Sequence, residues 1–352
     1  MSTKQEIILS GIRPTGRLHY GNYFGAIHHF LKLQEQKHRC YYFIADYHAL
    51  TTITEKQDYF QQTIDMLRTF FACGLDPHES VIYRQSDLPC TAEFALLLGM
   101  ITNIGFLERG TTYKDKMSKL TANENLEGNP LSFGLLGYPV LMAADILIVK
   151  ADTVPVGDDQ RQHVEMASDI AQRFNHRFGE TLKLPKTVAR DALRLPGLDG
   201  SAKMGKSDNN TLDLLDDPKT VLKKIKGVQT STEPMPLNGE SNEPANVIPQ
   251  LPPSLATLYR LLNLLAPQDV YNDFVEKYRK QEKFYGTLKT TLADYVNAFN
   301  APIIERFNDP ANSPEFVQDV LRENAKKVTP VALDTVESCR EAMGIGRSLF
   351  RA

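Results

Sequence analysis

The chain has 352 residues, 42% of them hydrophobic, which is enough for a large buried core and more than one domain. Its formal net charge of −3 excludes a uniformly basic nucleic-acid-binding protein, so contact with RNA must come from local basic patches. The four cysteines match no zinc pattern, and the apolar run near the start is too short for a signal peptide or membrane span, so we expect a cytoplasmic protein with no membrane association.

The first half of the chain alternates strand-like and helix-like segments. Short apolar runs predict strands, and apolar residues recurring every three or four positions predict helices. In chain order we expect strands at 6–10, 40–46, 80–85 and 153–156, and helices at 20–34, 55–73, 92–102, 138–149 and 160–178. This alternation predicts an α/β fold with a doubly wound, Rossmann-type parallel sheet, whose ligands bind at the carboxyl ends of the strands.

The second half of the chain changes character. Residues 182–207 are interpreted as loop, and from about residue 216 the pattern is helical. We expect helices at 220–226, 254–265, 268–280, 286–299, 315–328 and 330–343, with a long loop at 230–253 that is rich in proline, asparagine and serine. The sequence therefore predicts a second, all-helical domain.

A glycine- and proline-rich turn after the first strand leads into the segment Pro14–Asn22, which opens a helix. Gly16 and Gly21 would let a polyphosphate approach the backbone, and the helix N-terminus offers free N–H groups and a positive dipole end. His19 and Asn22 lie three residues apart, so both side chains can reach one phosphate. The alternative is an ordinary strand–turn–helix corner.

A second candidate phosphate segment is Lys203-Met204-Gly205-Lys206-Ser207. Two lysines on a glycine-rich loop suit a transition state in which pyrophosphate leaves an α-phosphate. For an isolated segment of this kind, a solvated lysine-rich loop would be the better explanation. Residues 116–120 have nearly the same sequence, and Lys116 is a further candidate for the triphosphate.

The segment between these two carries a helix with an acidic residue on an apolar stripe. Tyr138, Met142 and Asp145 are spaced i, i+4 and i+7 and therefore share one helical face. A carboxylate buried there without a donor would cost roughly several kcal/mol. Asp145 either caps a neighbouring backbone group in the core or accepts a hydrogen bond from a ligand N–H such as that of indole.

These segments together carry a family resemblance. Residues 14–22 resemble the "HIGH" signature of class I aminoacyl-tRNA synthetases, with Asn22 in the last position, and residues 203–207 resemble the "KMSKS" loop, with Gly205 in the third. The stretch 137–160 is similar to the "YPxLMAADIL" and "VPVGxDQ" blocks of the bacterial tryptophanyl enzymes. The similarity extends over nearly the whole chain, and the order of the segments assigns the lysine loop to 203–207 rather than 116–120.

The resemblance implies the residues of the tryptophan site. Asp145 would bind the indole nitrogen, and Tyr138 and Gln160 would hold the α-amino group. The other implied substrate contacts are Leu9, Gly11, His48, Met142, Ile146, Val154 and Val156. Leu9 departs from the family, which often has phenylalanine at that position. A site that pairs a ligand N–H would reject analogues without one by on the order of 10⁴–10⁵.

The resemblance also implies the ATP site and the catalytic groups. The implied ATP contacts are Arg13, Thr15, Gly21, Asn22, Gly157, Asp159, Lys203, Met204 and Lys206. The implied catalytic residues are His19, Asn22, Lys203, Lys206, Ser207 and Lys116. Arg13 stands where glutamine is often found, which adds a charge near the phosphates. No metal site on the protein is expected, and Mg²⁺ would accompany ATP as substrate.

In function, the resemblance implies ATP-dependent activation of L-tryptophan and its transfer to tRNA(Trp) by a homodimer. It implies a catalytic domain at 1–207 with an insertion near 105–130, an anticodon-binding domain at 208–315, and C-terminal helices at 316–352 that pack back on the catalytic domain. The lysines at 219, 223, 224 and 226 give a basic face that would serve RNA or be merely solvated.

Three alternative functions remain open. A tyrosyl-tRNA synthetase would need partners for a phenolic hydroxyl, and the apolar wall at 154–157 offers few. A small-molecule adenylyltransferase shares the first motif but has no use for a helical half that could bind tRNA. A non-catalytic regulatory paralogue would bind tryptophan or RNA without needing intact His19, Asn22, Lys203 and Lys206.

Overall fold

A computed structural model describes residues 6–14, 16–52, 56, 58–110, 113–114, 132–189, 193–230 and 248–349, without the side chains of residues 52, 158, 159, 189 and 207. Thr15, Lys116 and most of the 105–130 insertion lie outside these ranges, as does most of the predicted loop at 230–253. No helix of the described ranges combines the length and apolarity needed to cross a bilayer.

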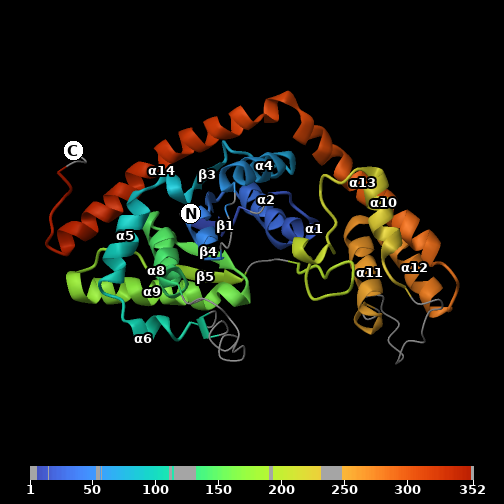
Figure 1. Cartoon of the computed structure of the whole chain (residues 1–352), viewed down its shortest axis with the longest axis horizontal. Helices are drawn as coiled ribbons and strands as arrows, with labels where there is room; N and C mark the ends of the chain where they lie inside the picture. Colours follow the sequence, from blue (N-terminus) through green and yellow to red (C-terminus); the bar gives the residue numbers. More distant parts are fainter. Residues whose placement is uncertain are drawn as a thin grey trace, which may run out of the picture.

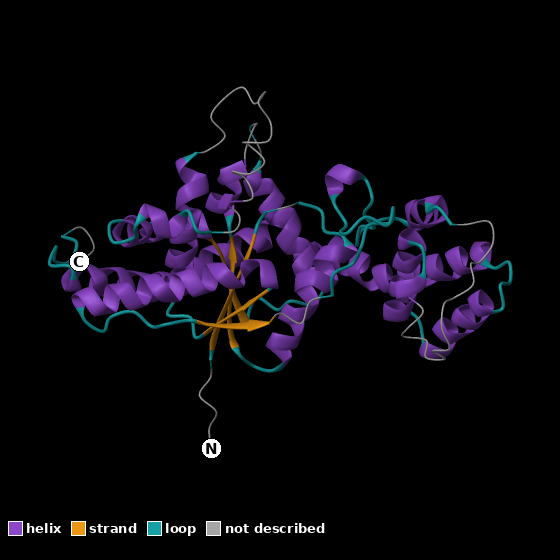
Figure 2. Ribbon diagram, turned by 90° about the horizontal axis from the view of Figure 1, so that it is seen from below, coloured by secondary structure: helices purple, strands orange, loops and turns teal. Residues whose placement is uncertain are grey.

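A parallel sheet of five strands forms the centre of the first half, in the order β3-β2-β1-β4-β5 (Figures 1 and 2). The strands are β1 (Ile7–Ile12), β2 (Arg39–Ile44), β3 (Ser80–Arg84), β4 (Thr153–Val156) and β5 (Lys186–Ala189). The predicted Rossmann-type sheet is thereby confirmed. The chain order reverses between β1 and β4, which opens a crevice at their carboxyl ends.

Helices make up the rest of the described elements. They are α1 (Tyr20–Asn22), α2 (His28–Glu35), α3 (Asp46–Ala49), α4 (Tyr59–Ala72), α5 (Cys90–Gly99), α6 (Ile104–Leu107), α8 (Phe133–Ile148), α9 (Asp158–Phe178), α10 (Pro218–Gly227), α11 (Pro253–Leu265), α12 (Gln268–Arg279), α13 (Tyr285–Asn308) and α14 (Pro314–Ala342). Side chains of Asp58, Ser132, Asp217 and Ser313 accept backbone N–H bonds at the starts of α4, α8, α10 and α14.

The two faces of the sheet contribute to two separate apolar cores, because successive side chains of a strand point to opposite faces. On one face, Ile8 and Tyr42 pack with α2 and α4 in a cluster that continues into the helical half. On the other face, Leu9 and Phe43 pack with α5, α8 and α9. The crevice between β1 and β4 opens on this second face.

The helix α14 connects the two cores. Its first half contributes Val317 and Leu321 to the first cluster, and its second half contributes Val336 and Cys339 to the other. It follows α13 in the arch seen in Figure 1 and lies against α4, β3, α5 and α8. At its far end, Arg340 Nη1 lies 2.7 Å from Glu93 Oε1. One helix therefore joins the two cores that lie on opposite faces of the sheet.

Three predicted elements differ from the structure. The two helices predicted at 315–328 and 330–343 are one helix that continues through Pro330, since packing on both sides of the proline outweighs its lost hydrogen bond. The helix predicted at 286–299 likewise continues through Pro302 to Asn308. The strand β5 lies within the stretch predicted as loop, because its pairing with β4 is not encoded in local periodicity.

Candidate active site

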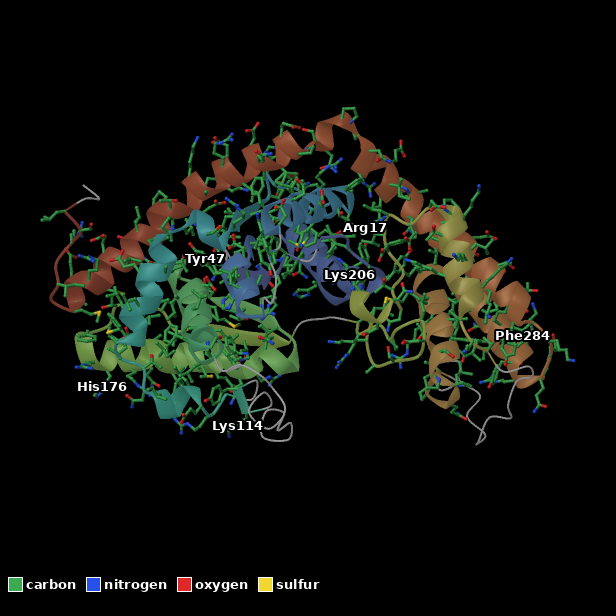
Figure 3. All side chains as sticks on the ribbon, viewed as in Figure 1. Arg17, Tyr47, Lys114, His176, Lys206 and Phe284 are labelled. Atoms are coloured by element: carbon green, nitrogen blue, oxygen red, sulfur yellow. The ribbon has the colours of Figure 1, made fainter. Side chains whose placement is uncertain are left out.

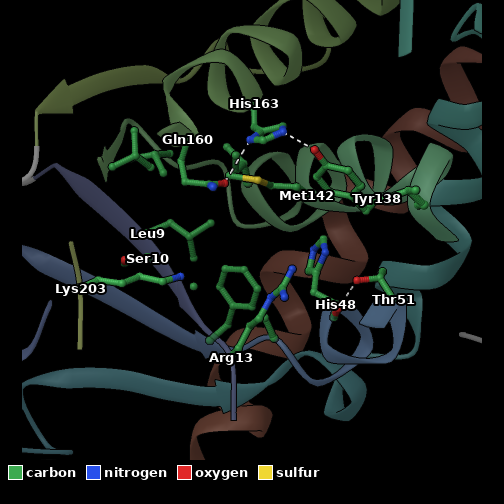
Figure 4. Close-up of a pocket in the computed structure, with 17 residues that line it drawn as sticks. Leu9, Ser10, Arg13, His48, Thr51, Tyr138, Met142, Gln160, His163 and Lys203 are labelled. Atoms are coloured by element: carbon green, nitrogen blue, oxygen red, sulfur yellow. Dashed lines mark hydrogen bonds between the residues drawn. The ribbon is translucent and has the colours of Figure 1, made fainter. Parts of the chain in front are cut away.

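A cavity of about 660 Å³ lies at the carboxyl ends of β1 and β4, where the strand order reverses (Figure 4). Many of the predicted site residues line it together, from segments that are far apart in the sequence. These are Leu9, Gly11, Arg13, His48, Tyr138, Met142, Ile146, Val154, Val156, Gln160 and Lys203. The remaining lining residues are Ser10, Phe43, Ala45, Thr51, Leu135 and His163.

One side of the cavity is apolar. The sheet contributes side chains from β1, β2 and β4, among them Leu9 and Val154, and α8 adds Met142 and Ile146. These residues are brought together because α8 packs across the sheet face that carries the odd-numbered residues of β1. Such a wall suits a flat hydrophobic ligand, whose transfer from water is favoured roughly in proportion to the apolar area it covers.

A polar corner faces this wall. The Tyr138 hydroxyl lies 2.5 Å from Nε2 of His163, and Nδ1 of His163 lies 3.1 Å from Oε1 of Gln160 (Figure 4). Since the amide oxygen can only accept, Nδ1 of a neutral ring donates to it, and Nε2 accepts from the hydroxyl. This arrangement fixes Tyr138 and Gln160 while leaving lone pairs on both of their oxygens, as an ammonium group requires.

The carboxylate of Asp145 lies behind the cavity wall rather than on it. Gln85 Nε2 donates to both of its oxygens, at 2.8 and 2.9 Å, and Nε2 of His48 lies 2.9 Å from Oδ2. Burial raises the pKa of Asp145, and the hydrogen bonds from His48 and Gln85 oppose this rise. Among Asp145, His48 and Gln85, His48 alone lines the cavity. Asp145 is therefore connected to the cavity through the imidazole ring of His48.

The first phosphate segment is hydrogen-bonded to the residues that follow the second one. A backbone hydrogen bond joins Tyr20 N to Leu212 O at 2.9 Å, and another joins Leu214 N to Leu18 O at 3.0 Å. A Cβ on Gly21 would lie 2.9 Å from the His19 ring and 3.4 Å from Cβ of Met204. The two predicted motifs therefore meet at a glycine, with no room there for a larger residue.

The imidazole of His19 is buried at the start of α1, where Asn22 Oδ1 accepts a hydrogen bond from the His19 backbone N–H at 3.1 Å. Burial lowers the pKa of His19 to about 4, Asp213 opposes the shift, and Lys206 and Lys224 add to it. His19 is therefore neutral near pH 7, so it can donate a hydrogen bond to a phosphate without carrying a charge.

The lysine loop is held by a residue that the sequence analysis did not single out. Asn210 Oδ1 accepts the backbone N–H of Gly205 at 2.8 Å, and Asn210 Nδ2 donates to Ser201 Oγ at 2.8 Å and to Lys203 O at 3.3 Å. Gly205 takes part through its backbone alone. One buried amide thus fixes both ends of the segment that carries Lys203.

The two lysines of the loop point to different places. Lys203 lines the cavity, whereas Lys206 lies near His19, Asp213 and Arg17 (Figures 3 and 4). Partial burial lowers the pKa of Lys206, Asp213 opposes this shift, and Arg17 adds to it. The loop therefore brings two separate cationic groups to the edge of the site.

Some predicted residues cannot be placed against the cavity. Thr15 and Lys116 lie outside the described residues, and so do the side chains of Asp159 and Ser207. Gly157 is the residue before α9, where a helix N-terminus presents its free N–H groups next to Val156.

The basic face predicted on α10 is corrected. Lys219, Lys223 and Lys226 are exposed on one side of the helix. Lys224 turns the other way, and its Nζ lies 2.7 Å from Asp216 Oδ2. The face therefore has one lysine fewer than the sequence indicates, because an ion pair with the preceding segment redirects that side chain.

Sequence analysis also missed Phe43, Gln85 and His163. Gln85 ends a predicted strand, and Phe43 lies near the carboxyl end of β2, positions that could have marked them. His163 follows Gln160 by three residues on one helix, so its face could have been inferred from spacing. Asn210 gave no local signal.

Comparison with known proteins adds direct relationships. Residues 1–301 match the family model described as tRNA synthetases class I (W and Y). A tryptophan–tRNA ligase of Porphyromonas gingivalis is 40% identical over 96% of this chain and 99% of its own length. Another, from Fusobacterium nucleatum, is 38% identical over 97% and 99%.

A solved structure agrees with these relationships. The tryptophanyl-tRNA synthetase from Campylobacter jejuni, complexed with ADP and tryptophan, superposes with a TM-score of 0.80 at 33% identity. The match covers 96% of this chain and 99% of that one. The family model, the full-length relatives and the shared architecture agree, and the chain therefore belongs to the class I tRNA synthetases of the W and Y type.

Proposed function

We propose that this protein activates L-tryptophan with ATP and transfers it to tRNA(Trp), as a tryptophan–tRNA ligase. The observation that carries the proposal is the cavity at the β1–β4 crevice, which joins an apolar wall, an ammonium-binding corner and Lys203 of the lysine loop. Full-length relatives that are named tryptophan–tRNA ligases support the same function.

In the first step, a carboxylate oxygen of tryptophan attacks the α-phosphorus of ATP. The bond from that phosphorus to the bridging oxygen breaks, and pyrophosphate leaves with its electron pair. Lys203 and Lys206 would stabilise the negative charge that develops on the phosphates, and neutral His19 would donate a hydrogen bond. Arg13, Gly21 and the start of α9 at Gly157 would hold the rest of the nucleotide.

In the second step, a ribose hydroxyl at the tRNA 3′ end attacks the tryptophanyl carbonyl, and AMP leaves. The helical half would contact the tRNA at a distance from the cavity. Lys219, Lys223 and Lys226 form an exposed basic face on α10 that fits a phosphate backbone.

We propose Mg²⁺ as part of the substrate rather than as a resident metal. Among the described residues, no group of three or more histidine, cysteine and acidic side chains could hold a metal ion. We propose that Mg²⁺ arrives on the ATP phosphates, where it would neutralise part of their charge.

We propose that Asp145 determines selectivity for the indole N–H. Its oxygens face His48 and Gln85, and each retains acceptor capacity beyond those bonds. Acceptance of the indole N–H requires the His48 ring to move aside. Tyrosine would bring a hydroxyl to the same wall, where Val154, Val156 and Ile146 provide no partner.

The function is tested by ATP–pyrophosphate exchange with each amino acid in turn, followed by charging of tRNA. Tryptophan is expected to stimulate exchange, and tyrosine is not. Exchange with tyrosine but not tryptophan would replace the assignment with a tyrosyl enzyme. No exchange with any amino acid would favour the non-catalytic paralogue, and exchange without charging would favour an adenylyltransferase.

We also propose that the protein is a homodimer. Leu96 of α5, Met100 directly after α5 and Ile104 at the start of α6 are each exposed by 60% or more, and they follow one another at four-residue intervals. A second copy of the chain would cover such a surface. Sedimentation equilibrium should give twice the chain mass, and Leu96→Glu should shift the mass towards the monomer.

The proposed place of action is the cytoplasm. All four cysteines are buried free thiols, as expected for a reducing compartment. Fractionation of cells that produce the protein would test this.

A further inference from the structure

We propose that Phe43 is a specificity-determining residue whose ring forms the aromatic surface on which the indole of tryptophan packs. The inference deepens the proposed function and rests on it, because it assigns a residue to that substrate.

Among the described residues that line the cavity, the sheet contributes one aromatic side chain. On the face that carries the odd-numbered residues, β1 contributes Leu9 and Gly11, and β4 contributes the aliphatic Val154 and Val156. Phe43, on β2, is the one ring that the sheet adds to the described lining. β1 itself therefore presents no aromatic group to a ligand, and the ring comes from the neighbouring strand.

Gly11 makes room for this ring. In the parallel register of β1 and β2, Gly11 pairs with Phe43. A Cβ on Gly11 would lie 2.5 Å from Cζ and 2.6 Å from Cε1 of the Phe43 ring, closer than real atoms approach. The ring therefore extends across β1 at the one position of that face where no side chain stands in its way.

The ring is also fixed from behind. Tyr83 of β3 stacks with Phe43 at a centroid distance of 6.2 Å and an interplanar angle of 28°. Tyr83 is fully buried, and Phe43 is 5% exposed, with its residual surface at the cavity. A ring held in this way can receive a second ring in an offset or tilted stack without further loss of side-chain freedom.

The other rings that line the cavity have polar partners. Tyr138 and His163 are hydrogen-bonded to each other, and His48 is bonded to Asp145. They are suited to orienting polar groups of a ligand. Phe43, together with Met142 and Ile146 of α8, is suited to the apolar faces of an indole ring.

The test compares Phe43→Leu with Phe94→Leu. Phe94 is a buried phenylalanine in the same core cluster that does not line the cavity, so its variant loses the same ring away from the substrate. F43L should raise the Kd and KM for tryptophan about tenfold, with kcat at saturating tryptophan nearly unchanged. F94L should leave both constants for tryptophan unchanged.

Fluorescence distinguishes a loss of packing between Phe43 and the indole from a general loss of structure. The chain contains no tryptophan, so bound L-tryptophan is the sole indole in the complex. Its emission in the wild-type complex should lie at shorter wavelengths than in water. F43L should move that emission towards the value in water, and F94L should not.

A second route perturbs the ring without removing it. Gly11→Ala should displace the Phe43 ring and raise the Kd for tryptophan, and the same change should cost much less in the F43L background. The exchange L9F/F43L, which moves a ring to β1, should restore most of the affinity. These comparisons hold even if one single variant folds poorly.

The outcomes distinguish this inference from the proposed function. If wild-type protein gives no tryptophan-dependent exchange, the proposed function fails. If wild-type protein is active but F43L and F94L give the same Kd, KM and emission as each other, Phe43 is not the indole surface and the inference is overturned.

Discussion

Asp145 is the residue whose surroundings differ most from its predicted role. The predicted stripe of Tyr138, Met142 and Asp145 lies on one helix, but the His48 side chain, from α3, stands between the carboxylate and the cavity. Its two donors, His48 and Gln85, come from the segments that follow β2 and β3. A buried carboxylate with two donors fits a structural aspartate of the core as well as an indole-binding residue. Kinetic measurements on variants distinguish these two roles.

We expect Asp145→Asn to raise the KM for tryptophan by roughly 10- to 100-fold, because an amide N–H₂ would face the donors of His48 and Gln85 and leave buried groups unpaired. The preference for tryptophan over phenylalanine should fall in parallel. Competitive exchange assays measure both. Asp152→Asn, at the opposite end of β4, is the control. Unchanged selectivity in D145N would remove Asp145 from the indole site.

The buried His19 should make stability depend on pH. Its folded pKa of about 4 lies below the ordinary value of 6.5 for histidine, so the unfolded chain binds more protons between these values. The contribution of the neutral His19 to the free energy of unfolding is therefore fully present above the pKa of the unfolded chain. It is lost as the pH falls towards the folded pKa, and the loss is at most about 3 kcal/mol.

His19→Asn should reduce that loss. Urea unfolding at about pH 7 and about pH 5 should show a smaller fall in unfolding free energy for H19N than for wild type, because the variant has no group to protonate in that window. The exposed His78 gives a control in His78→Asn. An equal fall in H19N and wild type would contradict the burial of a neutral imidazole.

At the scale of elements, the lysine loop at 203–207 and the basic face of α10 should have different roles. Lys203→Ala is expected to lower kcat for pyrophosphate exchange by roughly 10²–10³, because it removes a charge at the developing negative phosphates. Lys223→Ala, on the exposed face of α10, is its matched control and should leave exchange unchanged while weakening tRNA charging, more so at high salt. A similar loss of exchange in both variants would refute this division of roles.

The same loop shows how a motif depends on a distant residue. Asn210 holds Gly205 and Lys203 through its side-chain amide, and the strand-like segment that follows pairs with the residues around His19. Two short motifs separated by some 180 residues, at 19–22 and 203–207, are thereby fixed against each other. Neither motif would have a defined geometry alone.

At the scale of the whole molecule, α14 should make the cores on the two faces of the sheet unfold together. It contributes to both apolar cores, so loss of packing at one end should be felt at the other. Val336→Ala should lower the free energy of unfolding by about 1–3 kcal/mol and shift one single transition. Val188→Ala, at a half-exposed position of β5, should change little. Two separate transitions in V336A would show that α14 does not couple the two cores.

The sequence by itself determined the main architecture and most lining residues of the cavity. Continuous apolar runs such as 40–44 and helical periodicities are local properties, so the Rossmann-type sheet and the helical half follow from them. The two phosphate motifs and the 138–160 block identified the family because their side chains act within short segments. Leu9, Tyr138 and Gln160 were therefore available before the fold was known.

Only the tertiary structure decided which residues from separate elements meet. It added Phe43 above Gly11, Gln85 beneath Asp145 and Asn210 inside the lysine loop, and it turned Lys224 away from the basic face. It also made α14 continuous through Pro330. The reason is common to all of these features: strand pairing, ring contacts and buried hydrogen bonds depend on partners far along the chain, and local patterns carry no record of them.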